Sequence, residues 1–320
     1  DGAGDLAVAV ADLLLLPPTP PPGSAPPNLL IVSLDTLRAD HLPLYGYARD
    51  TAPFLSELGQ RLAVYEQATR SSNWTLPAHA SLFTGLHPYQ HGSVHADAPP
   101  DERGKVHTGI PLRQSALTLA EILSERDMLA MGVVAGPYLH RRFGMDQGFA
   151  LYSDQWLGLN RRGPSVTEHA LAWVEEFGDR PFFLFLNYFD PHVPLNPEGC
   201  EGDDDEILRQ YGIDIAKFRW NQMRDLGLRQ LPEPLRDALV RRYDAEIRVV
   251  DDELRRLFTA LEARSLLDHT LVVIVGDHGE AFGEHDTFGH GSALYQEEVR
   301  VPLLYGFLDS DAAGSRVSDP

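Results

Sequence analysis

The sequence predicts an α/β protein built on a mostly parallel central sheet with helices on both faces. Apolar runs of strand length, such as 29–34 and 271–275, alternate along the chain with segments of helical period, such as 165–177 and 235–261. Several runs are almost continuously apolar, which is typical of strands buried on both faces of a parallel sheet. With 320 residues, 43% of them hydrophobic, the chain is long enough to bury a substantial core.

The expected elements follow a proline-rich linker. Residues 1–27 hold an apolar segment at 6–16, which is too short to span a bilayer, and a polyproline-like stretch at 17–27. We therefore place the folded domain at 28–320. Its expected strands lie at 29–34, 64–68, 129–135, 182–186, 271–275 and 301–307, and its expected helices at 53–62, 75–84, 117–126, 165–177 and 235–261. Residues 196–234 lack a regular period, and we interpret them as a surface insertion.

The charge composition excludes one class of partner. The chain has 47 acidic and 27 basic residues and a formal net charge of −20. Because binding to a nucleic-acid backbone needs a basic face, no nucleic-acid partner is expected. An acidic surface instead suits a protein that holds a cation locally. The single cysteine, Cys200, allows neither an intrachain disulfide nor a cysteine-based zinc site.

The segment 75–84 predicts a short helix with a hydroxyl at its start. Thr75 is a good N-cap residue, Pro77 suits the first turn, and Gly85 is a natural C-terminal stop. The Thr75 hydroxyl would lie at the positive end of a helix dipole, where an anion, or a hydroxyl that attacks one, is favoured. An ordinary threonine-capped helix is the alternative for this segment taken alone.

Three predicted strands end in acidic or imidazole side chains. Asp35 follows the first strand, Asp190 and His192 follow the strand at 182–186, and Asp277 and His278 follow the strand at 271–275. Parallel strands place their carboxyl ends at one edge of the sheet, and ligands of such sheets bind outside that edge. We expect these side chains to meet there, with helix capping and turn formation by aspartate as the alternative.

The residue types at this edge suit a divalent metal. Asp35, Asp277 and His278 offer two carboxylates and one imidazole, which favour Zn²⁺ or Mn²⁺, with Ca²⁺ or Mg²⁺ left open. Thr75 would complete the metal site, and the metal would favour its alkoxide as a nucleophile. Three further histidines are candidates to contact phosphate or sulfate oxygens or to protonate a leaving group: His79, His192 and His290.

Five motifs in order give the chain a resemblance to the sulfatase family within the alkaline phosphatase superfamily. They cover 28 to about 308 and are 33–40 (SLDTLRAD), 75–85 (TLPAHASLFTG), 190–194 (DPHVP), 243–246 (YDAE) and 276–280 (GDHGE). The resemblance implies an alkaline-phosphatase-like α/β sandwich and a metal-dependent hydrolase of sulfate or phosphate esters. It also implies a further small sheet beyond residue 320.

Four positions depart from the family pattern. Thr75 stands where sulfatases have a Cys or Ser that is converted to formylglycine, and a threonine cannot give that aldehyde. His79 stands for an Arg, Thr36 for the second of two adjacent metal-binding Asp residues, and His290 for a Lys. These departures resemble the phosphodiesterase-type and phospholipid-headgroup-transferase branches, in which threonine is the nucleophile.

The sequence thus predicts a metal-dependent hydrolase that acts on phosphate or phosphonate mono- or diesters or on sulfate esters through Thr75. One alternative is a phosphoethanolamine- or phosphoglycerol-type headgroup transferase, and another is a non-catalytic binding module of the same fold. Expected substrates are small-molecule, lipid or glycan esters. We expect a periplasmic or other extracytoplasmic location, with membrane association through a segment preceding residue 1.

Overall fold

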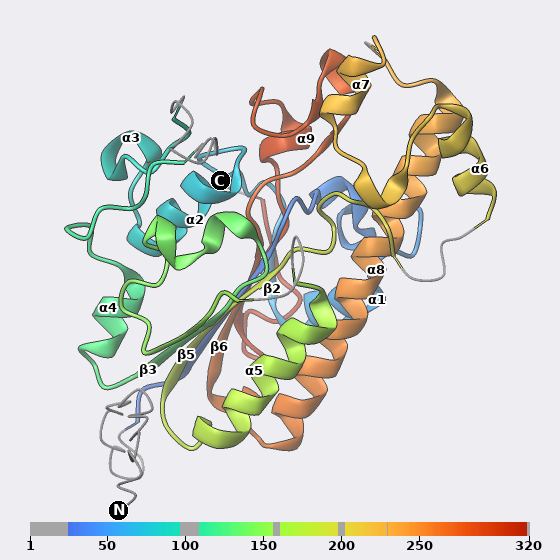
Figure 1. The fold of residues 1–320 in the computed structure, drawn as a ribbon. Coiled ribbons are helices and arrows are strands. Elements are labelled where there is room, and N and C mark those ends of the chain that lie inside the picture. Colours follow the sequence, from blue (N-terminus) through green and yellow to red (C-terminus); the bar gives the residue numbers. More distant parts are fainter. Residues whose placement is uncertain (1–24, 97–108, 156–160, 198–201, 229, 319–320) are drawn as a thin grey trace, which may run out of the picture.

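The computed structural model describes residues 25–96, 109–155, 161–197, 202–228 and 230–318 (Figure 1). The apolar segment 6–16 and most of the linker 17–27 lie outside these ranges. Among the helices that are described, none has the length and apolar composition needed to cross a bilayer.

The described strands and helices follow the predicted order closely. The strands are β1 (Asn28–Leu34), β2 (Ala63–Tyr65), β3 (Leu129–Val133), β4 (Leu151–Ser153), β5 (Phe182–Tyr188), β6 (Thr270–Gly276), β7 (Ala281–Phe282), β8 (Phe288–Gly289), β9 (Leu303–Phe307) and β10 (Arg316–Val317). The helices are α1 (Pro53–Arg61), α2 (Thr75–Thr84), α3 (Pro88–His91), α4 (Leu119–Ser124), α5 (Gly163–Phe177), α6 (Asp203–Gln210), α7 (Asn221–Asp225), α8 (Glu233–Ala263) and α9 (Gln296–Val299).

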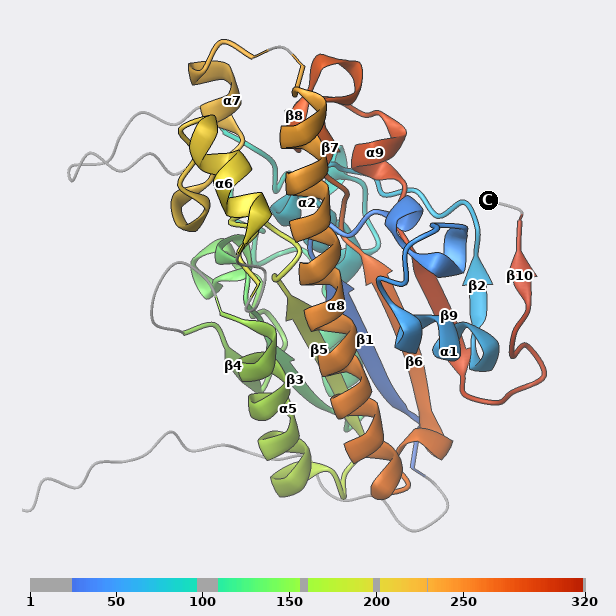
Figure 2. The ribbon, with the colours of Figure 1, turned by 90° about the vertical axis from the view of Figure 1, so that its right-hand side faces the viewer.

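The main sheet has the strand order β10-β2-β9-β6-β1-β5-β3-β4. Every neighbouring pair from β6 to β4 is parallel, and only β9 runs against its two neighbours. β1 lies at the centre between β6 and β5 (Figure 2). The sheet is therefore mostly parallel, as the sequence predicts, and the carboxyl ends of β6, β1 and β5 are adjacent.

Helices cover both faces of this sheet, with α1, α5 and α8 on one face and α2 and α4 on the other (Figure 1). Alternate residues of a strand point to opposite faces. In β5, Leu184 and Leu186 pack into the core under α5 and α8, whereas Phe183 and Phe185 pack into the core under α2. Since both faces are buried, the strand needs an unbroken apolar run, which is the pattern that predicts it.

The interpretation of 196–234 as a surface insertion is wrong. The segment contains α6 and α7, and it contributes Leu208, Phe218 and Met223 to the main core, each at most 1% exposed. Its acidic stretch is paired with α8, through Arg241 to Asp204 and Arg242 to Asp205. Helices of five to eight residues are too short to show a clear period, so the sequence pattern missed them.

Candidate active site at the carboxyl edge of the sheet

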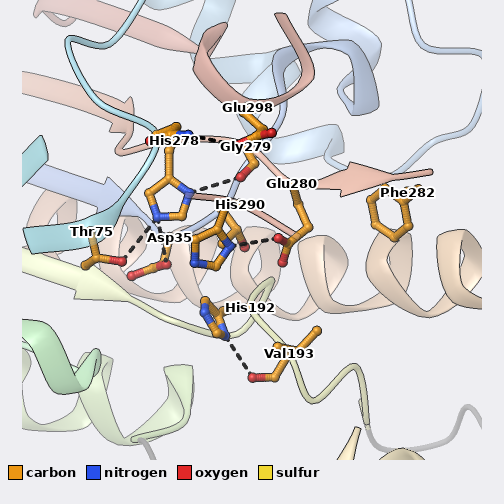
Figure 3. A network of polar contacts seen from close by, with 12 residues as sticks. Asp35, Thr75, His192, Val193, His278, Gly279, Glu280, Phe282, His290 and Glu298 are labelled. Carbon is orange, nitrogen blue, oxygen red and sulfur yellow. Dashed lines mark hydrogen bonds and ion pairs between the residues drawn. The ribbon is translucent and has the colours of Figure 1, made fainter. Parts of the chain in front are cut away.

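The polar residues that follow β1, β5 and β6 meet at one edge of the sheet, together with the first residue of α2 (Figure 3). Asp35 follows β1, and Asp277 and His278 follow β6. These two strands are paired in register as far as Leu34 and Gly276, so the residues after them lie side by side. All three side chains are fully buried.

One ligand atom from each of Asp35, Asp277 and His278 lies within 4.8 Å of the other two. Both carboxylate oxygens of Asp35 and Oδ2 of Asp277 are buried without a hydrogen-bond partner. Unpaired buried carboxylate oxygens are costly, and a bound cation removes that cost. The donor set, two carboxylates and an imidazole, is one that Zn²⁺ and Mn²⁺ accept. The residues present therefore fit the divalent metal that the sequence predicts.

Main-chain hydrogen bonds fix the orientation of Asp277. Its Oδ1 accepts the backbone N–H groups of Thr36 at 3.1 Å and His278 at 2.8 Å, which leaves Oδ2 facing the cluster. Thr36 has a φ of +54°, an unfavourable conformation for a β-branched residue. The strained turn after Asp35 thus directs the backbone N–H of Thr36 toward Asp277. The sequence alone did not predict this role of Thr36.

The ring of His278 is oriented for ligation through Nε2. Its Nδ1 lies 3.0 Å from the Gly279 carbonyl oxygen, which can only accept, so Nδ1 carries the proton. Nε2 is then unprotonated in the neutral ring, and it lies 3.1 Å from the Thr75 hydroxyl and 3.4 Å from Asp277 Oδ2. A histidine whose second ring nitrogen donates its N–H to a carbonyl oxygen is the usual arrangement of a metal ligand.

Thr75 is not the N-cap of its helix, which corrects the sequence prediction. Trp74 occupies that position with extended backbone and no side-chain capping bond, and Thr75 is the first helical residue. Its hydroxyl is therefore not used to cap the helix but points at His278 Nε2. Thr75 still lies among the free N–H groups of the first turn, and Gly85 ends the helix at a φ of +68°, as expected.

The electrostatics of the cluster also favour a cation. Burial, followed by the nearby charge of Asp277, raises the pKa of Asp35 well above its usual range. Burial lowers the pKa of His278 well below that of a free imidazole, so the ring stays neutral. A divalent ion held by these groups would favour the ionised carboxylates and the neutral imidazole together.

His79 lies behind the cluster, fully buried, and has both ring nitrogens occupied. Nδ1 donates to the Thr75 carbonyl at 2.8 Å, and Nε2 lies 2.8 Å from the Ser33 hydroxyl, which donates to it. Burial lowers the pKa of His79 to about 4, so the ring is neutral. The structure thus joins His79 to the start of α2 and to β1, which fits a positioning role better than contact with a substrate.

His192 and His290 lie beside each other on the open side of the cluster, with ring centres 5.1 Å apart (Figure 3). His290 Nδ1 is 2.7 Å from a carboxylate oxygen of Glu280. Burial would lower the pKa of His290, but the charge and hydrogen bond of Glu280 outweigh it and raise that pKa. Burial, then the charge of His290, lowers the pKa of His192 to about 4. The two imidazoles of the pair thus have pKa values shifted in opposite directions, upward for His290 and downward for His192.

Two residues one turn apart on α8, Tyr243 and Glu246, hydrogen-bond to the loops of the site. The sequence motif 243–246 did not predict these contacts. The Tyr243 hydroxyl donates to the Thr36 carbonyl at 2.7 Å and accepts from Arg38 N–H at 2.9 Å. Glu246 accepts the Asn196 N–H at 2.9 Å and binds Arg162, which also reaches Asp190 at 3.1 Å. α8 therefore holds both the turn after Asp35 and the loop that carries His192.

Known proteins are similar to this chain in sequence. The chain is 26% identical to the multifunctional alkaline phosphatase superfamily protein PehA of Trinickia caryophylli, over 87% of this chain and 67% of the relative. It is 22% identical to a sulfatase of Formosa agariphila, over 87% of this chain and 64% of the relative. The chain thus spans about two thirds of the length of these curated relatives.

A solved structure gives the same fold. The phosphonate monoester hydrolase of Agrobacterium radiobacter superposes with a TM-score of 0.68 at 19% identity, over 91% of this chain and 70% of the other. The sulfatase family model, described simply as sulfatase, matches residues 27–313. Together with the ordered motifs and the cluster at the sheet edge, this match shows that the chain belongs to the sulfatase family of the alkaline phosphatase superfamily.

Proposed function

We propose that this protein is a metal-dependent hydrolase that cleaves an anionic ester by attack of the Thr75 hydroxyl on phosphorus or sulfur. The observation that carries the proposal is the position of Thr75 Oγ1. It lies 3.1 Å from His278 Nε2, at the first residue of a helix and beside two carboxylates with unpaired oxygens. An activated hydroxyl in a metal-type donor set is the arrangement that such an attack needs.

Asp35, Asp277, His278 and Thr75 would hold the metal, with Zn²⁺ or Mn²⁺ as first candidates. When bound, the ion supplies positive charge that favours the threonine alkoxide and neutralises oxygens of the ester. The positive end of α2 favours the same charges. His290, whose pKa is raised by its contact with Glu280, faces the open side of the site and can donate a proton.

The proposed reaction has two halves. In the first, the Thr75 hydroxyl has lost its proton to solvent, its oxygen bonds to phosphorus, and the bond from phosphorus to the alcohol oxygen breaks. His290 gives the departing alcohol a proton. In the second, water bonds to phosphorus as His290 recovers a proton from it, and the bond to Thr75 breaks. The neutral ring of His192 donates from Nδ1 to the Val193 carbonyl at 2.8 Å, so its Nε2 can accept a hydrogen bond from the attacking water.

We further propose that phosphorus esters are preferred over sulfate esters. An unmodified threonine alkoxide suffices for in-line attack on phosphorus, where positioning and charge neutralisation supply most of the catalysis. The formylglycine that the family resemblance implies for sulfate-ester cleavage cannot form from Thr75. A sulfate ester is the second candidate substrate, and the sulfatase names of the family and of the Formosa agariphila relative favour it.

A panel of chromogenic phosphate monoesters and diesters, phosphonates and sulfate esters, run with Mn²⁺ and with Zn²⁺, tests this function. We expect Thr75→Ala to be inactive and Thr75→Ser to keep measurable turnover, because serine retains the hydroxyl. Mass spectrometry after an acid quench should find a phosphoryl group on the peptide that contains Thr75. Faster turnover of sulfate esters than of every phosphorus ester would reverse the preference, and normal turnover by Thr75→Ala would overturn the proposed nucleophile.

A further inference from the structure

A cavity of about 870 Å³ opens beside the candidate active site. His192 and His290 form part of its lining, and Trp74, next in sequence to Thr75, forms another part. Because the proposed leaving group departs on the side of His290, the alcohol part of a substrate would lie in this cavity. We call it the Trp74 cavity.

One side of the Trp74 cavity is a rigid group of rings. Trp74 packs against Tyr138 with ring centres 4.6 Å apart and an angle of 66°, and against His95 at 5.5 Å. The three rings all line the cavity. Flat aromatic surfaces held by their neighbours bind the flat or apolar face of a ring at little cost in side-chain entropy.

An exposed leucine stands at the same cavity. Leu294 is 72% exposed, although large apolar side chains of the described residues are mostly buried. A ligand that covers it would remove apolar surface from water, which favours binding. Leu294 and the ring group together therefore favour an occupant with an apolar face.

The charge of the cavity limits what that occupant carries. None of the lining residues that the structure describes is Lys, Arg, Asp or Glu; besides histidine, the residues with polar side-chain groups are serine, asparagine, tyrosine and tryptophan. The whole chain meanwhile has a formal net charge of −20. The imidazole of His290 is already paired with Glu280, so a second anionic group on the alcohol would find no unpaired counter-charge in the described lining, and the field of the protein would repel it.

We propose that the Trp74 cavity binds an uncharged, ring-containing alcohol, either a phenol or a single neutral pyranose. The substrate would then be a small ester with one anionic group rather than a polyanionic glycan chain. This inference rests on the proposed function for the ester group, but it concerns only the alcohol. It can therefore be tested by binding of the free alcohols, without turnover.

The experiment measures binding of matched alcohols to the wild-type protein by ligand-observed NMR titration. Phenol is compared with 4-hydroxybenzenesulfonate, methyl glucoside with the corresponding methyl glucuronide, and 1-hexanol serves as an apolar alcohol without a ring. We expect each neutral ring to bind about tenfold more tightly than its charged counterpart, the scale of one partly screened charge repulsion. The phenol and glucoside arms decide which ring is preferred.

Three variants make the test specific. Trp74→Ala should weaken binding of the preferred ring about tenfold, the scale of a lost aromatic contact. Trp173→Ala, the same change on α5 outside the lining, should not. Leu294→Lys, at an exposed position that tolerates a polar side chain, should invert the selectivity toward the sulfonate. Should Trp74→Ala fail to fold, Leu294→Lys decides the question alone.

The inference is overturned by equal binding of neutral and charged rings, by hexanol binding as tightly as phenol, or by unchanged selectivity in Leu294→Lys. Turnover of the phosphate and sulfate monoesters of the same alcohols is measured in parallel. If the alcohols bind as expected but no ester is cleaved with either metal, the proposed function fails and the alcohol site stands. If an ester is cleaved but the alcohols bind without ring selectivity, the proposed function stands and the alcohol site fails.

Discussion

The two halves of the candidate site lie a few ångströms apart but are built differently. Asp35, Asp277 and His278 come directly after neighbouring parallel strands, and main-chain groups orient Asp277 and His278. His192 and His290 come from loops. The His192 ring bonds the main-chain carbonyl of its neighbour Val193, but the contacts with distant segments are made by side chains: Glu280 binds the His290 ring, and the Arg162–Glu246 pair holds the loop of His192. The sheet therefore fixes the cluster, whereas side-chain packing fixes the histidine pair, and changes in each half should have different signatures.

The largest effect is expected in the cluster. Asp277→Asn keeps the acceptor for Thr36 N–H but replaces the unpaired Oδ2 with an amide group that cannot ligate a metal well. We expect loss of stoichiometric Zn²⁺ or Mn²⁺, measured by elemental analysis of the purified protein, and a fall in turnover of about a thousandfold or more. Asp252→Asn, at an exposed position of α8, is the matched control. Full metal content in the Asp277 variant would place the metal elsewhere.

The histidine pair should show a smaller loss with the metal retained. His192→Gln and His290→Gln each remove an imidazole that faces the open side of the cluster, and we expect turnover to fall about a hundredfold, the usual scale of lost acid–base or electrostatic help. His269→Gln, an exposed residue just before β6 at the opposite end of that strand, is the control. Wild-type turnover in both site variants would assign these histidines to the structure alone.

Variants of the two supporting residues on α8, Glu246 and Tyr243, should affect the two halves of the site differently. Glu246→Gln keeps an acceptor for Asn196 N–H but loses the charge that holds Arg162. We expect turnover to fall about tenfold, on the scale of one lost charged hydrogen bond, with metal affinity unchanged. Tyr243→Phe removes the bond to the Thr36 carbonyl, on the cluster side, and should instead weaken metal binding. The same signature in both variants would contradict the division between sheet-fixed and side-chain-fixed halves.

The last expected effect concerns stability against pH rather than turnover. Burial raises the pKa of Glu246 from 4.5 to about 7, despite the opposing effect of Arg162; Asp190, beside them, raises it further. Between pH 4.5 and about 7 the folded state therefore binds more protons than the unfolded state. The stability that protonated Glu246 contributes is present at low pH and is lost as pH rises through about 7. At about 1.4 kcal/mol per pKa unit, the change is at most roughly 3 kcal/mol.

Urea unfolding of the wild type and of Glu246→Gln from pH 5 to 8 measures the pH-dependent contribution of Glu246 to the free energy of unfolding. Glutamine does not titrate, so the variant should gain stability relative to the wild type as pH rises toward 8. A constant difference between the two proteins across this range would show that Glu246 has an ordinary pKa in the folded state. The comparison cancels the titration of groups that both proteins share and that lie far from Glu246.

The sequence by itself determined the sheet and the positions of the cluster. The apolar runs of β1, β5 and β6 are local patterns, and a parallel sheet brings their carboxyl ends to one edge whatever the rest of the chain does. Asp35, Asp277 and His278 could therefore be predicted to meet, and the start of α2 could be predicted to lie with them. Their role in metal binding stays a prediction that the Asp277 variant tests.

Only the tertiary structure decided which side chains support the site. Arg162 and Glu246 are 84 residues apart, and Tyr243 reaches Thr36 across 207 residues, so no local pattern links them. His79 and His192 look alike in sequence, yet one is sealed behind the cluster and the other lines the cavity. The burial of α6 and α7 was missed for the same physical reason: contacts between distant segments depend on how the helices pack, and packing leaves no period in a short segment.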